Sequence, residues 1–316
     1  MLFKGCCLLK LQNNSALKNI FTFSLAFALL GLVYVSCNND DDGFDEIPPR
    51  DRGEESIAAD IELVEYLQTH FYNYEEFAAP PAGFDFKIVL DTIAGDNSNK
   101  TALIDQVETK VVTDLSEEDV TYNLYYLTGR QGEGNSPKFV DSTLVTFEGR
   151  LTNGTLFDGS PNPVWFDLTA VIPGFQEGLV EYSGSTGSTT NSDGTETFEN
   201  FGSGAIFLPS GLAYFNQPPA SNIPFYSQLI FTFTMLDAIQ ADHDRDGILS
   251  IDEDLNNNGN IFDDNTDGDN FPNFVDFDDD EDGVSTRDEI EIDDDGNVTF
   301  PDSDGDGVPD YLDPDN

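Results

Sequence analysis

Residues 171–179 read Val-Ile-Pro-Gly-Phe-Gln-Glu-Gly-Leu, and this stretch decides the fold. Proline is favoured at the first position of a helix, where its missing N–H is not needed, and glycine is favoured just past the last. Pro173 and Gly184 therefore predict a helix over residues 173–182. It is the only helix that we expect between residues 120 and 239.

The chain on either side of this helix has the composition of strands. Segments 121–127, 143–147 and 229–235 are rich in aromatic and β-branched side chains, and Gly, Asn and Pro residues separate them. This pattern predicts an antiparallel sheet. Because a sheet with one short helix needs that helix to cover a face, we expect an α+β domain.

Four motifs occur in this region in a fixed order. They are FEGRL at 147–151 followed by NGTLFD at 153–158, VIPGFQEGL at 171–179, LPSGLAY at 208–214, and IP at 223–224 leading to QLIF at 228–231. Their order and spacing resemble the FKBP-type peptidyl-prolyl cis-trans isomerases. The resemblance implies a domain over residues 119–239, in which an antiparallel β-sheet wraps around one short helix, and it implies prolyl isomerase activity.

Such an activity makes modest chemical demands. Amide resonance opposes rotation about a peptide bond with a barrier of roughly 18–20 kcal/mol. A twisted amide has less charge separation than a planar one, so an apolar slot favours the transition state over the planar ground state. We therefore expect no cofactor for catalysis.

The resemblance also assigns residues to roles. Tyr214 would donate its hydroxyl to a substrate carbonyl, the backbone N–H of Ile172 would hold another carbonyl, and Asp158 would lie near the twisting bond. The predicted catalytic residues are Asp158, Tyr214, Phe157 and Ile172. The predicted walls of the substrate pocket are Phe147, Val171, Phe175, Ile223 and Phe231.

Four positions depart from the family pattern. Phe147 stands where a Tyr is usual and Phe175 where many members have Trp, so a polar hydrogen-bonding group is lost at each. Val164 occupies a position that is often aromatic, and Phe215 replaces a usual Gly. These changes predict a wider pocket and an altered flap over 215–226. The Gly-, Ser- and Thr-rich segment 183–204 predicts an extended hairpin.

Residues 1–36 have the features of a signal peptide. Three lysines and no acid precede an apolar run over 20–35, which ends at Cys37. A buried core helix is the alternative, and the basic start fits it poorly. Val-Ser-Cys at 35–37 resembles a bacterial lipobox, which implies an acylated Cys37, a membrane anchor and an outer-membrane lipoprotein of the cell envelope. The anchor would face either the periplasm or the cell surface.

Residues 37–56 are acidic and predict a linker, which is either a solvated spacer or a tether that directs the protein to the cell surface. An N-terminal extension follows over 57–118. Apolar residues recur in it at steps of three or four: Ile61, Val64, Leu67, Phe71 and Tyr74. This spacing predicts one amphipathic helix over 57–77.

Composition excludes several functions. The formal net charge of −48 would repel a phosphate backbone, so we expect no nucleic-acid partner. All three cysteines lie within residues 1–37, which excludes a disulfide or zinc site in a processed chain. His70 and His243 are the only histidines, and neither lies near a nucleophile motif, so a serine hydrolase is disfavoured.

Residues 240–316 form an acidic tail with a repeated spacing of oxygen side chains. Loop positions one, three and five are Asp, position six is Gly, and positions nine and twelve also carry oxygen, which is the pattern of an EF-hand calcium loop. The predicted calcium ligands are Asp242, Asp244, Asp246, Ser250, Glu253, Asp278, Asp280, Asp282, Thr286, Glu289, Asp302, Asp304, Asp306, Asp310 and Asp313.

Prolines interrupt the helices that a sensor EF-hand would need, and the closely spaced copies resemble thrombospondin type 3 repeats. That resemblance implies structural Ca²⁺ in place of an apolar core. A merely solvated acidic tail is the alternative.

The sequence thus predicts a prolyl isomerase that assists the folding of exported, proline-containing polypeptides. One alternative is a catalytically weak, calcium-ordered chaperone or binding lipoprotein with the same fold. Another is a surface adhesin in which the tail is the functional part.

Overall fold

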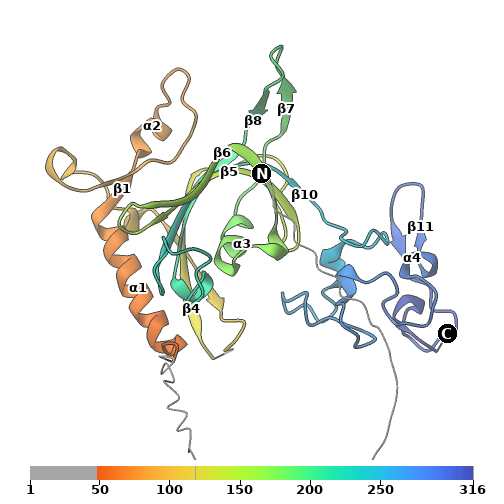
Figure 1. The fold of residues 1–316 in the computed structure, drawn as a ribbon. Coiled ribbons are helices and arrows are strands. Elements are labelled where there is room, and N and C mark those ends of the chain that lie inside the picture. The colour runs from red at the N-terminus through yellow and green to blue at the C-terminus, as the bar shows by residue number, and fades with distance from the viewer. Residues whose placement is uncertain (1–47, 118, 316) are drawn as a thin grey trace, which may run out of the picture. The chain divides into compact units, whose positions relative to one another are not determined.

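The computed structural model describes residues 48–117 and 119–315 (Figure 1). The predicted signal peptide, Cys37 and the first part of the linker lie outside the described residues. Within the described part of the chain, no helix combines the length and apolar character needed to cross a bilayer. Residues 49–316 form one compact unit.

The centre of this unit is a six-stranded antiparallel sheet, which confirms the predicted α+β class. The strand order is β3-β4-β9-β10-β5-β6. The strands are β3 (Glu108–Thr113), β4 (Thr121–Arg130), β5 (Ser142–Leu151), β6 (Leu156–Asp167), β9 (Gly202–Leu208) and β10 (Leu229–Ile239). β9 and β10 lie in the middle and pair without interruption from Leu208–Leu229 to Gly202–Met235.

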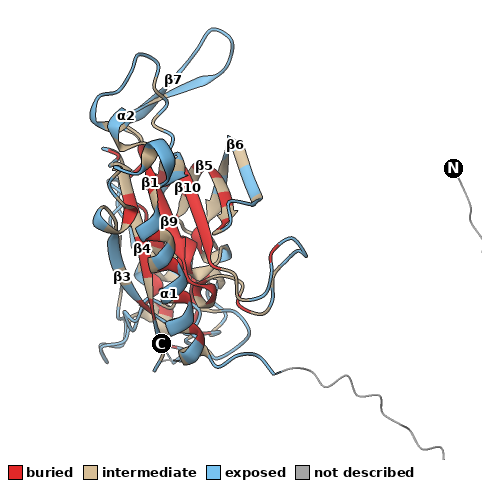
Figure 2. Cartoon of the chain, turned by 90° about the vertical axis from the view of Figure 1, so that its left-hand side faces the viewer, coloured by how far each residue is buried: buried red, intermediate tan, exposed pale blue. Residues whose placement is uncertain are grey.

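The sheet is buried on both faces, because a different helix covers each. The curved sheet surrounds α3 (Pro173–Leu179) on one side, and α1 (Arg52–Thr69) lies along the other (Figures 1 and 2). Along β9, Ile206 and Leu208 belong to the apolar cluster on the α3 side, whereas Ala205 and Phe207 belong to the cluster on the α1 side. This alternation explains why every residue of β9 is buried.

The N-terminal helix differs from the prediction in position and in facing. It begins at Arg52, inside the predicted linker, because the Asp51 carboxylate caps it by accepting the Glu54 N–H at 2.9 Å. It ends at Thr69, so Phe71 and Tyr74 are not part of it. Its buried face carries Glu55, Ala59, Leu63 and Leu67, whereas the predicted core residue Ile61 is 64% exposed.

The rest of the N-terminal extension is made of short elements. They are β1 (His70–Tyr72), α2 (Tyr74–Ala78), β2 (Leu90–Thr92) and the 3-10 helices η1 (Gly95–Asn97) and η2 (Leu103–Asp105). β1 pairs with β2, and their neighbours pack on the α1 side of the sheet. β3 also falls within the predicted extension of 57–118, yet it pairs with β4 as an edge of the main sheet.

Short elements also connect the central strands. β7 (Gly187–Thr190) and β8 (Glu196–Glu199) form the separate hairpin that segment 183–204 predicts. The 3-10 helix η3 (Leu168–Ala170) precedes α3, and the 3-10 helix η4 (Ser210–Leu212) precedes the flap.

The acidic tail has little regular structure. Its elements are η5 (Ser250–Glu253), η6 (Asn273–Val275), α4 (Thr286–Glu289), β11 (Glu291–Ile292), β12 (Val298–Thr299) and η7 (Asp310–Leu312). Ala241 N–H donates to Asp141 Oδ1 at 3.1 Å, and Val140 packs with Ile261 and Phe274. These contacts attach the start of the tail to the sheet domain.

Candidate functional sites

Phenylalanine rings from three elements meet beside α3. Phe147 on β5, Phe175 on α3 and Phe231 on β10 are all buried. The ring centres of Phe175 and Phe231 are 4.8 Å apart, and Phe147 lies 6.3 and 6.4 Å from them. Three of the five predicted pocket walls therefore form one continuous apolar floor.

Phe157 reaches this floor because β5 carries a glycine, Gly149, beside its ring. A Cβ atom at Gly149 would lie 2.7 Å from Phe157 Cζ and 3.0 Å from Phe231 Cε1. Without that atom, the rings of Phe157 and Phe231 pack edge to face with centres 5.6 Å apart. The glycine of the FEGRL motif is thus explained by packing.

A partly exposed rim surrounds the buried rings. Phe157, Val171, Ile172 and Tyr214 are half-buried and pack against the same cluster, and Ile223 is buried within it. Asp158 is exposed beside Phe157. Burial raises the pKa of the Tyr214 phenol, and the negative charge of Asp158 raises that pKa further. The phenol is therefore a neutral donor at physiological pH.

The start of α3 fixes Ile172 at this rim. Ile172 is the N-cap residue in an extended conformation, and its carbonyl accepts the N–H groups of Phe175 and Gln176 at 2.9 and 3.2 Å. Pro173 follows at the first helical position. The structure thus brings all nine predicted catalytic and pocket residues to one region, while their individual roles stay predictions.

One expectation about the pocket needs revision. Val164 suggested a missing aromatic wall, but Phe166, two residues further along β6, packs with ring centres 5.3 Å from Phe147 and 5.8 Å from Phe175. The wall is therefore aromatic. The alternation of β6 side chains carried this signal, since Val164 and Phe166 point to the same face of the strand.

The flap begins and ends at aromatic residues held by the N-terminal segment. Phe215 and Tyr226 both have positive φ, at 48° and 60°, and their rings are 5.0 Å apart. The Arg52 guanidinium lies 4.3 Å from the Phe215 ring centre, and Arg50 lies 4.2 Å from that of Tyr226. The buried Glu55 accepts the Ser210 hydroxyl at 3.0 Å, which fixes η4 just before the flap.

The acidic tail contains a repeated loop whose closing bond was not foreseen. In the first loop (242–253), His243 N–H donates to Ser250 Oγ at 3.2 Å. The same bond between positions two and nine closes the third loop (278–289), where Asp279 N–H donates to Thr286 Oγ1 at 3.1 Å. It also closes the fourth loop (302–313), from Ser303 N–H to Asp310 Oδ1. Ser250, Thr286 and Asp310 thus close their loops, and their role as ligands stays a prediction.

This bond identifies a second loop (265–276) that sequence reasoning missed. Thr266 N–H donates to Asn273 Oδ1 at 2.9 Å, and position four is Gly268 with a φ of 76°. Position six is Asn270 instead of glycine, which hid the copy from a search based on that glycine. The alternation of Asn265, Asp267 and Asp269 was the available signal.

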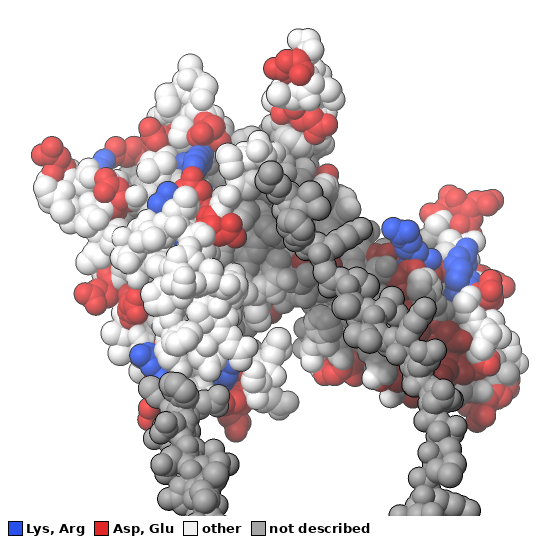
Figure 3. Space-filling view, in the orientation of Figure 1, with Lys and Arg blue, Asp and Glu red and all other residues white. Residues whose placement is uncertain are grey.

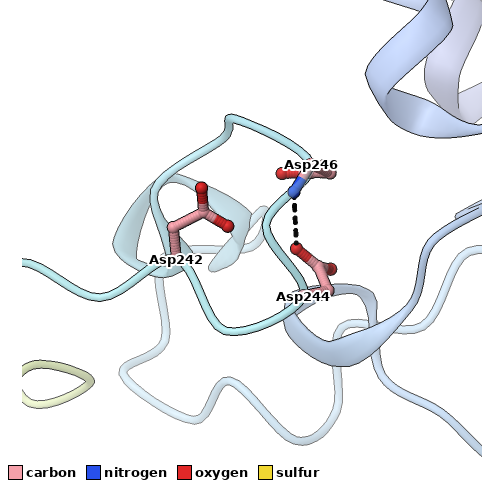
Figure 4. Close-up of side chains that lie close together, drawn as sticks. All are labelled: Asp242, Asp244 and Asp246. Carbon is pink, nitrogen blue, oxygen red and sulfur yellow. Dashed lines mark hydrogen bonds between the residues drawn. The ribbon is translucent and has the colours of Figure 1, made fainter.

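Carboxylates gather inside these loops. Four groups of three aspartates each have one oxygen per residue within 4.8 Å of the other two. The groups are Asp242, Asp244 and Asp246 (Figure 4); Asp267, Asp269 and Asp276; Asp278, Asp280 and Asp282; and Asp302, Asp304 and Asp306. The predicted ligands Glu289 and Asp313 do not belong to any such group among the described residues. On the face shown in Figure 3, acidic side chains crowd the tail.

The donor set fits a hard cation. These groups contain only carboxylate oxygens, which Ca²⁺ prefers, and no histidine or cysteine. Burial and the charges of neighbouring aspartates raise the pKa of Asp244 to about 7. Carboxylates in this arrangement repel one another unless a proton or a cation lies between them.

Two family models match the chain. Residues 134–236 match the FKBP-type peptidyl-prolyl cis-trans isomerase model, and residues 243–300 match a model described as BamM C-terminal. The first match contains every predicted catalytic and pocket residue, and the second covers the first three tail loops.

Curated relatives match the same sheet domain. The chain is 34% identical over 111 residues to a probable FKBP-type isomerase, FkpA, of Neisseria meningitidis, covering 34% of this chain and 35% of that protein. It is 46% identical over 59 residues to the isomerase Mip of Coxiella burnetii, covering 18% and 26%. The chain thus spans about a third or less of the length of these relatives.

A crystal structure of a peptidyl-prolyl cis-trans isomerase from Pseudomonas syringae pv. tomato also matches. It is 17% identical, with a TM-score of 0.35, and the match covers 61% of this chain and 99% of that one.

Proposed function

Because residues 134–236 form an FKBP-type peptidyl-prolyl cis-trans isomerase domain, we propose that the whole protein catalyses cis-trans isomerisation of X–Pro bonds in polypeptides. The observation that carries this proposal is the apolar floor of Phe147, Phe175 and Phe231, bordered by the Tyr214 phenol and the Asp158 carboxylate. Proline-containing polypeptides are the substrate class.

The resemblance to the family implies how each group acts. The proline ring lies on the aromatic floor, where the planar amide loses the solvation of its separated charges. Tyr214 donates its O–H to a substrate carbonyl, and the Ile172 N–H holds a second carbonyl. These bonds keep the chain on both sides of the proline fixed while the bond between them turns. Asp158 lies at the rim, near the twisting bond.

Tyr214→Phe tests this proposal. Removing one donor lowers kcat/KM by about 10-fold, the factor that corresponds to one hydrogen bond of about 1.4 kcal/mol. Proline-limited refolding of a test protein is the measurement, and Asp158→Asn should also slow it. Tyr126→Phe is the matched control, since Tyr126 lies on β4 and donates to Glu108 at 3.2 Å, away from the rim.

A second function competes with the first. Phe147 and Phe175 carry no polar atoms, so the floor could hold peptides without speeding isomerisation. In that case the protein is a chaperone or binding protein of the same fold. Refolding rates unchanged by Tyr214→Phe, combined with retained binding of an unfolded protein, would favour it.

The tail, we further propose, binds structural Ca²⁺ in its four loops. The four aspartate groups and the positive φ at position four of each loop, from Arg245 to Gly305, support this proposal. Affinities on the order of 0.1–1 mM suit a calcium-rich compartment. Titration of the whole protein with Ca²⁺ in a calorimeter tests it, and an absence of binding heat at millimolar Ca²⁺ would refute it.

The proposed location is the cell envelope, through a lipid on Cys37. The basic start, the apolar run and the lipobox-like residues 35–37 support an outer-membrane lipoprotein, on either the periplasmic side or the cell surface. Cys37→Ser should abolish palmitate incorporation and release the protein from membranes. Palmitate labelling of the serine variant equal to that of the wild type would refute the anchor.

A further inference from the structure

Three carboxylates from two different loops meet in the interior of the tail. Asp246 and Glu253 belong to the first loop, and Asp279 belongs to the third. One oxygen from each lies within 4.8 Å of the other two. Their side chains are only 1%, 1% and 2% exposed, so this group is far more buried than those at the loop surfaces.

Five of the six carboxylate oxygens in this group lack hydrogen-bond partners. Both oxygens of Glu253 and both oxygens of Asp279 are buried without any partner, and so is Asp246 Oδ2. The other oxygen of Asp246 accepts the Ile248 N–H at 2.7 Å. A buried carboxylate without a partner is strongly destabilising, and three together repel one another as well. The fold therefore leaves five oxygens facing a position that a cation would satisfy.

Asp279 is not explained by the loop that contains it. The loop-closing bond uses only its backbone N–H, and the residues at the same position of the other loops are His243, Thr266 and Ser303. Asp279 is thus the only acid at position two. Its carboxylate turns away from its own aspartate group and toward the first loop.

Apolar contacts hold the same parts of the tail together. Ile248 of the first loop, Ile290 directly after the third and Tyr311 of the fourth form one buried cluster. Tyr311 is 5% exposed within this cluster. The meeting of Asp279 with the first loop is therefore part of a packed arrangement.

We infer that the first and third loops share one divalent cation, held jointly by Asp246, Glu253 and Asp279. A group made only of carboxylate oxygens suits Ca²⁺, which takes about six to eight oxygen ligands in flexible geometry, better than Mg²⁺, which demands a near-ideal octahedron and keeps several waters. The inference rests on the proposed calcium binding and adds to it a ligand from outside the loop. The shared ion would join the first and third loops, which are separated in sequence by the second, into one rigid body.

The test compares Asp279→Asn with Glu281→Gln in the whole protein. Both changes remove one negative charge from the third loop, but Glu281 is exposed and belongs to no carboxylate group. Calorimetric titration with Ca²⁺ should show one class of site weakened by about 10-fold or more in Asp279→Asn and unchanged in Glu281→Gln. Hydrogen exchange of residues 242–253 in saturating Ca²⁺ should accelerate only in Asp279→Asn.

A second measurement separates loss of the shared ion from loss of folding. Without Ca²⁺, Asp279→Asn removes repulsion from the buried group, so residues 242–253 should exchange more slowly than in the wild type. The effect of the variant thus reverses sign with Ca²⁺. Normal Ca²⁺ binding and unchanged exchange in Asp279→Asn would overturn the sharing while leaving the proposed calcium function intact. A wild type that binds no Ca²⁺ would overturn both.

Discussion

The sheet domain and the acidic tail are ordered by different means within one chain. The domain buries aromatic and aliphatic side chains on both faces of a sheet, whereas the largest apolar clusters within the tail contain only a few residues. In the domain, the carboxylate of Glu148 is paired with Lys87 and Arg150. In the tail, carboxylates such as Glu253 are buried without a partner. Burial thus accounts for the order of the domain, whereas the proposed function makes the order of the tail depend on bound Ca²⁺.

Removal of calcium should give the largest difference between the two regions. Withdrawing a ligand present at about 100 times its Kd lowers stability by about 2.7 kcal/mol, so hydrogen exchange in the tail should accelerate about 100-fold. Exchange in β9 and β10 should not change. The measurement is hydrogen exchange of the whole protein with Ca²⁺ and with a chelator. If the tail exchanged hydrogen equally slowly with Ca²⁺ and with a chelator, its order would not depend on calcium.

Phe231→Ala should give a loss of stability that is larger in free energy than that of one calcium ion and is confined to the domain. Phe231 is 5% exposed and packs on three other rings, so its truncation should lower the free energy of unfolding by about 3–5 kcal/mol. Trp165, the only tryptophan, lies on β6 and reports this unfolding by fluorescence. Phe274→Ala is the matched control, because Phe274 is equally buried but lies at the base of the tail. This variant should leave the midpoint of unfolding, followed by Trp165 fluorescence, nearly unchanged.

Gly149→Ala should have a smaller effect on the same floor. The new methyl group would lie 2.7 Å from the Phe157 ring, and overpacking of this kind costs about 1–3 kcal/mol. Urea unfolding followed by Trp165 fluorescence measures the loss. The double variant Gly149→Ala with Phe157→Leu should recover part of it. A single variant as stable as the wild type would show that the rings can move aside.

The ion pairs of Glu148 should contribute least. The hydrogen bond from Lys87, with the charge of Arg150, lowers the pKa of Glu148 below its usual value. A lowered folded-state pKa means that the stabilisation is present above the unfolded pKa and is lost as the pH falls through the folded one. Because these side chains are partly exposed, Lys87→Met should lower stability by less than about 1 kcal/mol at pH 7. The difference should vanish near pH 3 in urea unfolding curves.

The sequence was most informative where function and local structure coincide. The helix that starts at Pro173, the central strands and the residues of the rim followed from short motifs and their spacing. The facing of α1 followed only in part, because the predicted residue Leu67 is buried, whereas the predicted residue Ile61 is exposed and Ala59 and Leu63 take its place in the core. The sequence of one helix does not show which of its faces packs against the sheet, because tertiary contacts decide this.

Contacts between segments far apart in the chain also could not be predicted from the sequence. The pairing of β3 with β4 extends the sheet into a region that composition had assigned to the N-terminal extension. The approach of Asp279 to Glu253 depends on how separate loops stack, and no periodicity within one loop encodes it. The second loop, in contrast, was readable, and only the emphasis on glycine at position six concealed it.

The contacts of Arg50 and Arg52 have a mechanical consequence. These residues lie at the start of the described chain, and their guanidinium groups lie on the two aromatic rings that bound the flap. Tension applied to the N-terminal side would load Tyr226 and Phe215 before it reached any strand of the sheet. The position of the flap over residues 215–226 would therefore respond to pulling on the N-terminal side of the chain.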